Sequence, residues 1–130
     1  MTSHVAMIAV IVRDYDEAIA WYRDALQFEL LEDSERGEGK RWVRMAPRGN
    51  GRFSLLLARA ANDAQSRAIG DQHGGRVGFF LHTDDFAGDH ARLVAAGALF
   101  EEAPRHETYG SVVVFRDLYG NRWDLIEPAA

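Results

Sequence analysis

The chain has 130 residues, 47% of them hydrophobic, a length and composition that suit one domain with its own core. Its net charge is −5, and its 15 basic residues are scattered among 20 acidic ones, which disfavours nucleic-acid binding because that function needs a concentrated basic surface. The absence of cysteine excludes disulfides, thiolate metal sites and cysteine nucleophiles, and no apolar run is long enough to cross a bilayer. We therefore expect a cytoplasmic protein with neither a nucleic-acid nor a membrane partner.

Residues 4–59 predict one helix and four strands in the order βαβββ. Val5–Val12 is rich in β-branched residues and predicts a buried strand. Asp14 can cap the following helix, with Glu17 completing a capping box. One face of this helix is apolar and comprises Tyr15, Ala18, Ile19, Tyr22 and Leu26. Three strands are then expected at Phe28–Glu32, Arg41–Ala46 and Phe53–Ala58, separated by turns that include Pro47–Gly51.

Residues 75–128 repeat this order. Residues 60–74 between the two copies have no strong apolar period, which predicts a linker or one short helical turn. A strand is expected at Arg76–His82, and Thr83–Asp85 caps a second helix that ends at Gly97. The core side of this helix is predicted to hold Phe86, Leu93 and Val94. Further strands are expected at Ala98–Glu102, Ser111–Arg116 and Asn121–Glu127.

The two halves align at one constant offset. Placing Asp14 over Asp85 also places Val10 over Leu81 and Phe28 over Leu99. One half alone would cover only one face of its sheet and bury too little surface for a stable domain. We therefore predict an α+β fold in which two βαβββ modules form a curved mixed sheet around a central cleft, the usual place for a small-molecule ligand.

Two motifs point to a known family. The stretch from Val12 to Leu26, with its aromatic pair, resembles the first helix of the vicinal oxygen chelate superfamily, which includes glyoxalases, bleomycin resistance proteins and extradiol dioxygenases. The stretch from Phe115 to Glu127 resembles the closing hairpin of that superfamily, and together the motifs cover nearly the whole chain. Leu118 and Tyr119 replace the usual Pro-Asp, and Gln27 stands where the family often has Gly. The resemblance also implies a homodimer.

The same resemblance implies a divalent metal held by up to four side chains, one from the first and one from the last strand of each half. In this sequence these positions fall on Met7, near Leu56, and on Gly78 and Asp124. Only Asp124 is a suitable ligand for a hard cation, whereas catalytic sites of this kind keep about three protein ligands. We therefore predict no family-type metal and no cofactor.

The alternation of side chains along strands places Gly78, Phe80 and His82 on one face of their strand, and Arg122, Asp124 and Ile126 on one face of the last strand. If both faces line the cleft, His82, Arg122 and Asp124 converge. Asp124, amid apolar side chains, should have a raised pKa and is a candidate catalytic residue together with His82, although Asp124 could equally pair with Arg122. Trp42 and Arg44 share a face, so that Trp42 is either a ligand platform or a core aromatic. The predicted ligand-binding residues are Met7, Trp42, Arg44, Leu56, Phe80, His82, Arg122 and Asp124.

The sequence is compatible with three functions. The first is a metal-free binding protein that sequesters a drug or metabolite in an acidic, aromatic-lined cleft. The second is a metal-dependent glyoxalase-like lyase, isomerase or dioxygenase, against which the ligand count argues. The third is a metal-free enzyme that uses Asp124 or His82 in acid–base catalysis. A basic patch between Lys40 and Arg52 reads as the solvated side of a hairpin rather than a phosphate site.

Overall fold

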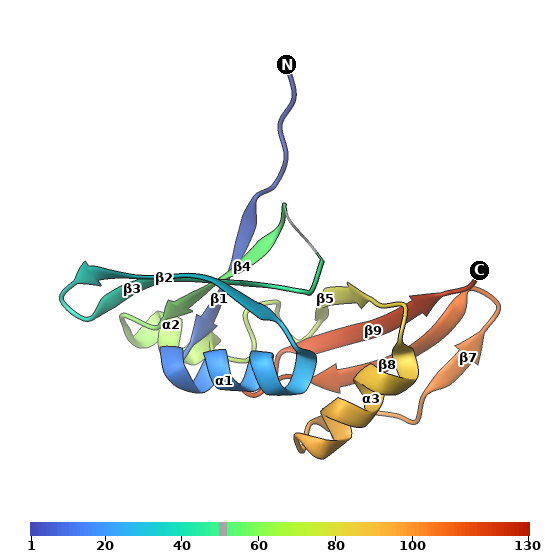
Figure 1. Cartoon of the computed structure of the whole chain (residues 1–130). Helices are drawn as coiled ribbons and strands as arrows, with labels where there is room; N and C mark the ends of the chain where they lie inside the picture. The colour runs from blue at the N-terminus through green and yellow to red at the C-terminus, as the bar shows by residue number, and fades with distance from the viewer. Residues whose placement is uncertain (50–51) are drawn as a thin grey trace. The chain divides into compact units, whose positions relative to one another are not determined.

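The computed structural model describes residues 1–49 and 52–130, which form two compact units, Met1–Ala68 and Ile69–Ala130. Each unit is an α+β module with its own mixed sheet, as the sequence predicts; in Figure 1 the first runs from blue to green and the second from yellow to red. Among the described residues, no helix is both long enough and apolar enough to cross a bilayer.

Unit 1 has a four-stranded sheet in the order β1-β4-β3-β2, in which β1 runs parallel to β4. Its elements are β1 (Met7–Val12), α1 (Tyr15–Leu26), β2 (Glu29–Gly37), β3 (Lys40–Ala46), β4 (Ser54–Arg59) and α2 (Asp63–Ala68). The helix α2 occupies part of the predicted linker. Of the predicted turn Pro47–Gly51, Asn50 and Gly51 lie outside the described residues.

The helix α1 forms as its sequence predicts. The Asp14 carboxylate accepts a hydrogen bond of 2.8 Å from the backbone N–H of Glu17, and the whole predicted apolar stripe is buried. Beneath it the sheet contributes the fully buried side chains of Val10, Val12, Val43, Met45 and Leu57. Gln27 ends the helix at φ 56°, in the left-handed region that favours glycine, which explains why the related position is often Gly.

Unit 2 repeats this arrangement with the strand order β5-β9-β8-β6, in which β5 runs parallel to β9. Its elements are β5 (Val77–His82), α3 (Phe86–Ala95), β6 (Leu99–Phe100), β7 (Arg105–Glu107), β8 (Gly110–Arg116) and β9 (Arg122–Pro128). The strand predicted at Ala98–Glu102 is reduced to two residues, and β7, which pairs with β8, was not predicted. Pro104, which has no N–H to donate, separates β6 from β7.

The helix α3 is capped by Asp85, which accepts from the backbone N–H of Gly88 at 3.1 Å, and Gly97 follows its end at φ 76°. Phe86 and Leu93 are buried as predicted, but the prediction for Val94 is wrong because its side chain is 56% exposed. The buried side of α3 includes Asp89 instead, whose carboxylate accepts hydrogen bonds from Thr83 and Arg92. An acid held in this way is compatible with burial, so the buried side of the helix cannot be found from hydrophobicity alone.

Candidate functional site

The face of the unit 1 sheet that points away from α1 carries several predicted ligand-binding residues. Since Val43 and Met45 face α1 and are fully buried, the alternation along β3 places Trp42 and Arg44 on the other face. Leu56 lies on this face as well, opposite Arg44 in the antiparallel pair. Met7 begins β1 opposite Ser54 on the same face.

Arg44 is occupied by an internal ion pair. Its Nε lies 3.0 Å from Oε1 of Glu32, the residue opposite it on β2, and its Nη1 donates to Ser54 Oγ at 3.4 Å. The hydrogen bond from Arg44 holds the pKa of the Glu32 carboxyl below its ordinary value. Arg44 therefore stabilises the sheet surface beside Trp42, and its guanidinium is only partly available to a ligand.

A pocket of about 560 Å³ opens where β3 begins and β4 ends; we call it the Trp42 pocket. Its apolar part is formed by the half-buried side chains of Trp42, Leu56 and Ala58. None of its lining residues is acidic, and four are cationic: Arg36, Lys40, Arg41 and Arg59. The expectation of an acidic binding surface is therefore wrong for this pocket, and two residues of the basic patch, Lys40 and Arg41, line it.

The wall of the Trp42 pocket is held by Arg41. Its guanidinium contacts Asp33 at 2.7 Å and Asp16 at 2.9 Å, and its backbone N–H donates to the Tyr15 hydroxyl at 3.2 Å. The hydrogen bond to Arg41 lowers the pKa of Asp33, and that to Asp33 raises the pKa of Arg41. This cluster joins α1 to the β2–β3 hairpin beside the pocket.

In unit 2 the register places Phe80 opposite Asp124 and His82 opposite Ile126, so these predicted residues share one face of the β5–β9 pair. Asp124 Oδ1 is buried, and no hydrogen-bond partner for it exists in the described part of the chain. Burial raises the pKa of the Asp124 carboxyl, in the direction expected from its apolar surroundings. Phe80 is 62% exposed beside it.

Arg122 does not form the ion pair with Asp124 that the sequence left open. It makes two hydrogen bonds to Glu101, of 2.7 and 2.8 Å, and donates to the Gly75 carbonyl at 2.9 Å. The hydrogen bond to Arg122 lowers the pKa of Glu101, and that to Glu101 raises the pKa of Arg122. Among the described residues, no cation is hydrogen-bonded to Asp124, and Arg122 instead contacts the loop before β5 through Gly75.

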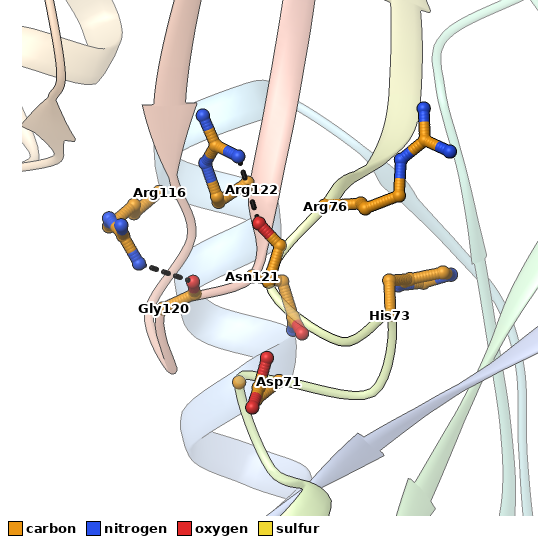
Figure 2. Close-up of a pocket in the computed structure, with 9 residues that line it drawn as sticks. Asp71, His73, Arg76, Arg116, Gly120, Asn121 and Arg122 are labelled. Atoms are coloured by element: carbon orange, nitrogen blue, oxygen red, sulfur yellow. Dashed lines mark hydrogen bonds between the residues drawn. The ribbon is translucent and has the colours of Figure 1, made fainter.

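A second, smaller pocket of about 60 Å³ lies in unit 2 and was not predicted (Figure 2). It is lined by charged and polar residues that include Asp71, His73, Arg76, Arg116, Asn121 and Arg122. Arg116 donates to the Gly120 carbonyl and also pairs with Glu101, so much of the positive charge is neutralised internally. The pocket is too small for a drug-sized ligand, and its volume suits ordered water. Asn121 Oδ1 is buried and has no hydrogen-bond partner in the described residues.

The wall of this second pocket depends on Asp117, which is 6% exposed. Its Oδ1 accepts from the backbone N–H groups of Tyr119, Gly120 and Asn121 at 3.0–3.1 Å. Its Oδ2 accepts from Asn121 Nδ2 at 2.9 Å and from Trp123 Nε1 at 3.2 Å. Gly70 lies so close to this turn that a Cβ there would be 1.9 Å from the Tyr119 carbonyl oxygen. Sequence reasoning did not single out Asp117, although an Asp before a turn glycine is a signal for this geometry.

Comparison with known proteins agrees with the repeated βαβββ arrangement. The sequence profile of the Glyoxalase/Bleomycin resistance protein/Dioxygenase superfamily matches residues 4–125. The chain belongs to this superfamily. The fold is therefore glyoxalase-like, as the resemblance of both motifs implied.

Individual proteins are similar over almost the whole chain. An uncharacterized protein of Shewanella frigidimarina strain NCIMB 400 is 48% identical over 98% of this chain and 95% of its own length. The crystal structure of TnmS3, an antibiotic binding protein from Streptomyces sp. CB03234, is 31% identical with a TM-score of 0.78, and 98% of each chain is covered. The structure of UcmS2 is 26% identical with a TM-score of 0.83, over 98% of this chain and 99% of that one.

The superfamily's metal positions can be compared between the two units. Leu56 opposes Ala9 in β1–β4, just as Asp124 opposes Phe80 in β5–β9, so Leu56 and Asp124 occupy equivalent places. Together with Met7 and Gly78, the four positions supply one thioether and one carboxylate, which do not fit a hard divalent cation. Within residues 1–49 and 52–130, no group of three or more His, Cys, Asp or Glu side chains could hold a metal ion.

Proposed function

We propose that this chain binds an apolar, ring-containing small molecule in the Trp42 pocket and needs no metal to do so. The observation that carries the proposal is the pocket itself, whose volume of about 560 Å³ lies in the range of drug-sized binding sites and whose apolar part includes an indole ring. The similarity to TnmS3, an antibiotic binding protein, supports the same class of function. Sequestration of a drug or metabolite is the simplest role for such a site.

The proposed ligand contacts in unit 1 are Trp42 and Leu56, with Met7 on the same face. For unit 2 we propose a separate group of ligand contacts, Phe80, His82 and Asp124, supported by the face of the β5–β9 pair that they share. Arg44 and Arg122 are proposed to position neighbouring groups, since each already donates to a glutamate.

The proposal is tested with N-phenylnaphthylamine, a neutral aromatic probe that becomes fluorescent in an apolar site. The wild-type chain should bind it saturably, and Trp42→Ala should weaken binding about tenfold or more because the variant loses the largest aromatic side chain that lines the pocket. Trp21→Ala is the matched control, because Trp21 lies on α1 outside the lining of the pocket and packs edge-on against Tyr22. Equal binding by wild type and Trp42→Ala would refute the proposed site.

A second candidate function rests on Asp124. Asp124 shares a face with Phe80 and His82, its Oδ1 is buried without a partner in the described residues, and burial raises the pKa of its carboxyl. These features favour an acid–base role. Once a ligand is found, Asp124→Asn separates the two functions: turnover lost with binding retained would make Asp124 an acid–base group. No turnover by the wild-type chain would leave binding as the function.

We also propose a homodimer, as the superfamily resemblance implies. Large apolar side chains are exposed in both units, among them Ile8, Leu30, Phe80 and Leu99. Light scattering at micromolar concentration should give twice the mass of the 14.6 kDa chain, and a monomer under these conditions would contradict the proposal.

A further inference from the structure

The Trp42 pocket has a charge that the composition of the chain does not predict. The whole chain carries a net charge of −5, yet the pocket lining contains four cationic and no acidic residues. Two of these cations lie beside carboxylates. Arg41 is held by Asp33 and Asp16, and Arg36 lies 3.6 Å from Glu32 with its guanidinium 5.7 Å from the centre of the Trp42 ring.

The other two cations, Lys40 and Arg59, are not neutralised. Within residues 1–49 and 52–130, no carboxylate lies within ion-pair distance of either of them. Lys40 is exposed at the first position of β3 and is the only lysine in the sequence. Positive charge that the protein does not compensate is available for a ligand.

Arg59 is also held in place. One of its terminal nitrogens donates to the Gly39 carbonyl at 3.0 Å, and its guanidinium lies 5.2 Å from the centre of the Tyr15 ring. These contacts orient the guanidinium but use only part of its five N–H donors. A donor group fixed before binding loses less conformational entropy when a ligand arrives, so Arg59 is suited to recognise an oxyanion.

We propose that the ligand of the Trp42 pocket is an aromatic anion, with its rings on Trp42 and Leu56 and a carboxylate or sulfonate facing Lys40 and Arg59. This inference rests on the proposed function of the same pocket and adds the class of ligand. A neutral or cationic aromatic would leave both cations uncompensated and would bind less tightly.

The experiment compares two probes that differ in one group: anilinonaphthalene sulfonate, which is anionic, and N-phenylnaphthylamine, which has the same rings without the sulfonate. The anionic probe should bind the wild-type chain more tightly at low ionic strength, and added salt should weaken its binding while leaving the neutral probe little affected. Lys40→Gln and Arg59→Gln should each weaken binding of the anionic probe about fivefold, the effect expected of a solvent-accessible charge pair, and should weaken binding of the neutral probe much less.

Arg23→Gln is the matched control, because it removes the same charge from an exposed position on α1 outside the pocket and should affect neither probe. Arg59→Lys should restore much of the binding lost in Arg59→Gln, which separates loss of charge from loss of folding. If Arg59→Gln does not fold, Lys40→Gln decides alone, since its side chain is exposed on the β2–β3 hairpin.

The outcomes distinguish the two proposals. If Trp42→Ala abolishes binding of both probes but the charge variants leave binding of the anionic probe unaffected, the proposed ligand class is wrong and the proposed binding site is supported. The ligand class is also wrong if the charge variants weaken both probes equally. If Trp42→Ala leaves both probes unaffected, the site itself is wrong and the anion preference falls with it.

Discussion

Replacement of Asp117 by alanine should severely destabilise unit 2. The carboxylate accepts from the backbone of Tyr119, Gly120 and Asn121 and from the side chains of Asn121 and Trp123. Asn121 and Trp123 are each 3% exposed, so water cannot easily replace the lost acceptor. Each buried donor that loses its partner costs about 1–3 kcal/mol, and some relaxation of the turn is expected, so we expect a loss of about 3–5 kcal/mol. This is a large fraction of the roughly 5–15 kcal/mol that stabilises an ordinary domain.

The assay is urea unfolding followed by far-ultraviolet circular dichroism and by tryptophan fluorescence. Asp84→Ala is the matched control, because Asp84 is exposed and should change stability by no more than about 0.5 kcal/mol. The stability of Asp117→Asn should lie between those of wild type and Asp117→Ala, since its amide oxygen still accepts from the turn but its amide nitrogen faces other donors. If Asp117→Ala remains within about 1 kcal/mol of wild type, the carboxylate does not hold the turn as described.

Two further changes test other parts of unit 2. Gly70→Ala should lower the free energy of unfolding by about 2–4 kcal/mol, because the new Cβ combines a φ of 77° with an overlap on the Tyr119 carbonyl. Gly74→Ala is the control, since Gly74 has a φ of 65° and open space around it, and should lower the free energy of unfolding by only about 1 kcal/mol. Equal losses of stability in thermal unfolding would contradict the close approach of Gly70 to Tyr119. Asp124→Asn should be as stable as wild type or more stable at neutral pH, because the raised pKa means that folding disfavours the ionised form. Its advantage should shrink as the pH falls toward the ordinary value of 3.8, and an advantage that grows on acidification would show that the pKa is instead lowered.

Much of the fold follows from local signals in the sequence. Asp14 and Asp85 each cap a helix because a short acid before an apolar stripe can satisfy a free backbone N–H, whatever the distant contacts are. The alternation of β3 likewise separates Val43 from Trp42 without knowledge of the rest of the chain. The prediction that Val94 is buried was wrong because Asp89 is buried on α3 instead, and its burial depends on hydrogen bonds from Thr83 and Arg92.

The candidate site was predictable only in its apolar part. Trp42 and Leu56 could be assigned to one face from strand alternation, and both line the pocket. The charge of the pocket could not be predicted, because it depends on which cations meet a carboxylate: Arg41 finds Asp33 across the β2–β3 hairpin, and Lys40 next to it finds none in the described part of the chain. The pairing of Arg122 with Glu101 had the same long-range origin, since the two residues come from different parts of unit 2.

The central claim, that a small aromatic molecule binds at Trp42, is tested most directly by nuclear magnetic resonance of the indole N–H groups. The chain has three tryptophans, and the signals can be assigned with the Trp42→Ala and Trp21→Ala variants. On titration with anilinonaphthalene sulfonate, the Trp42 signal should shift saturably while the Trp21 signal stays in place. A shift of Trp21 or Trp123 with no change at Trp42 would contradict the account.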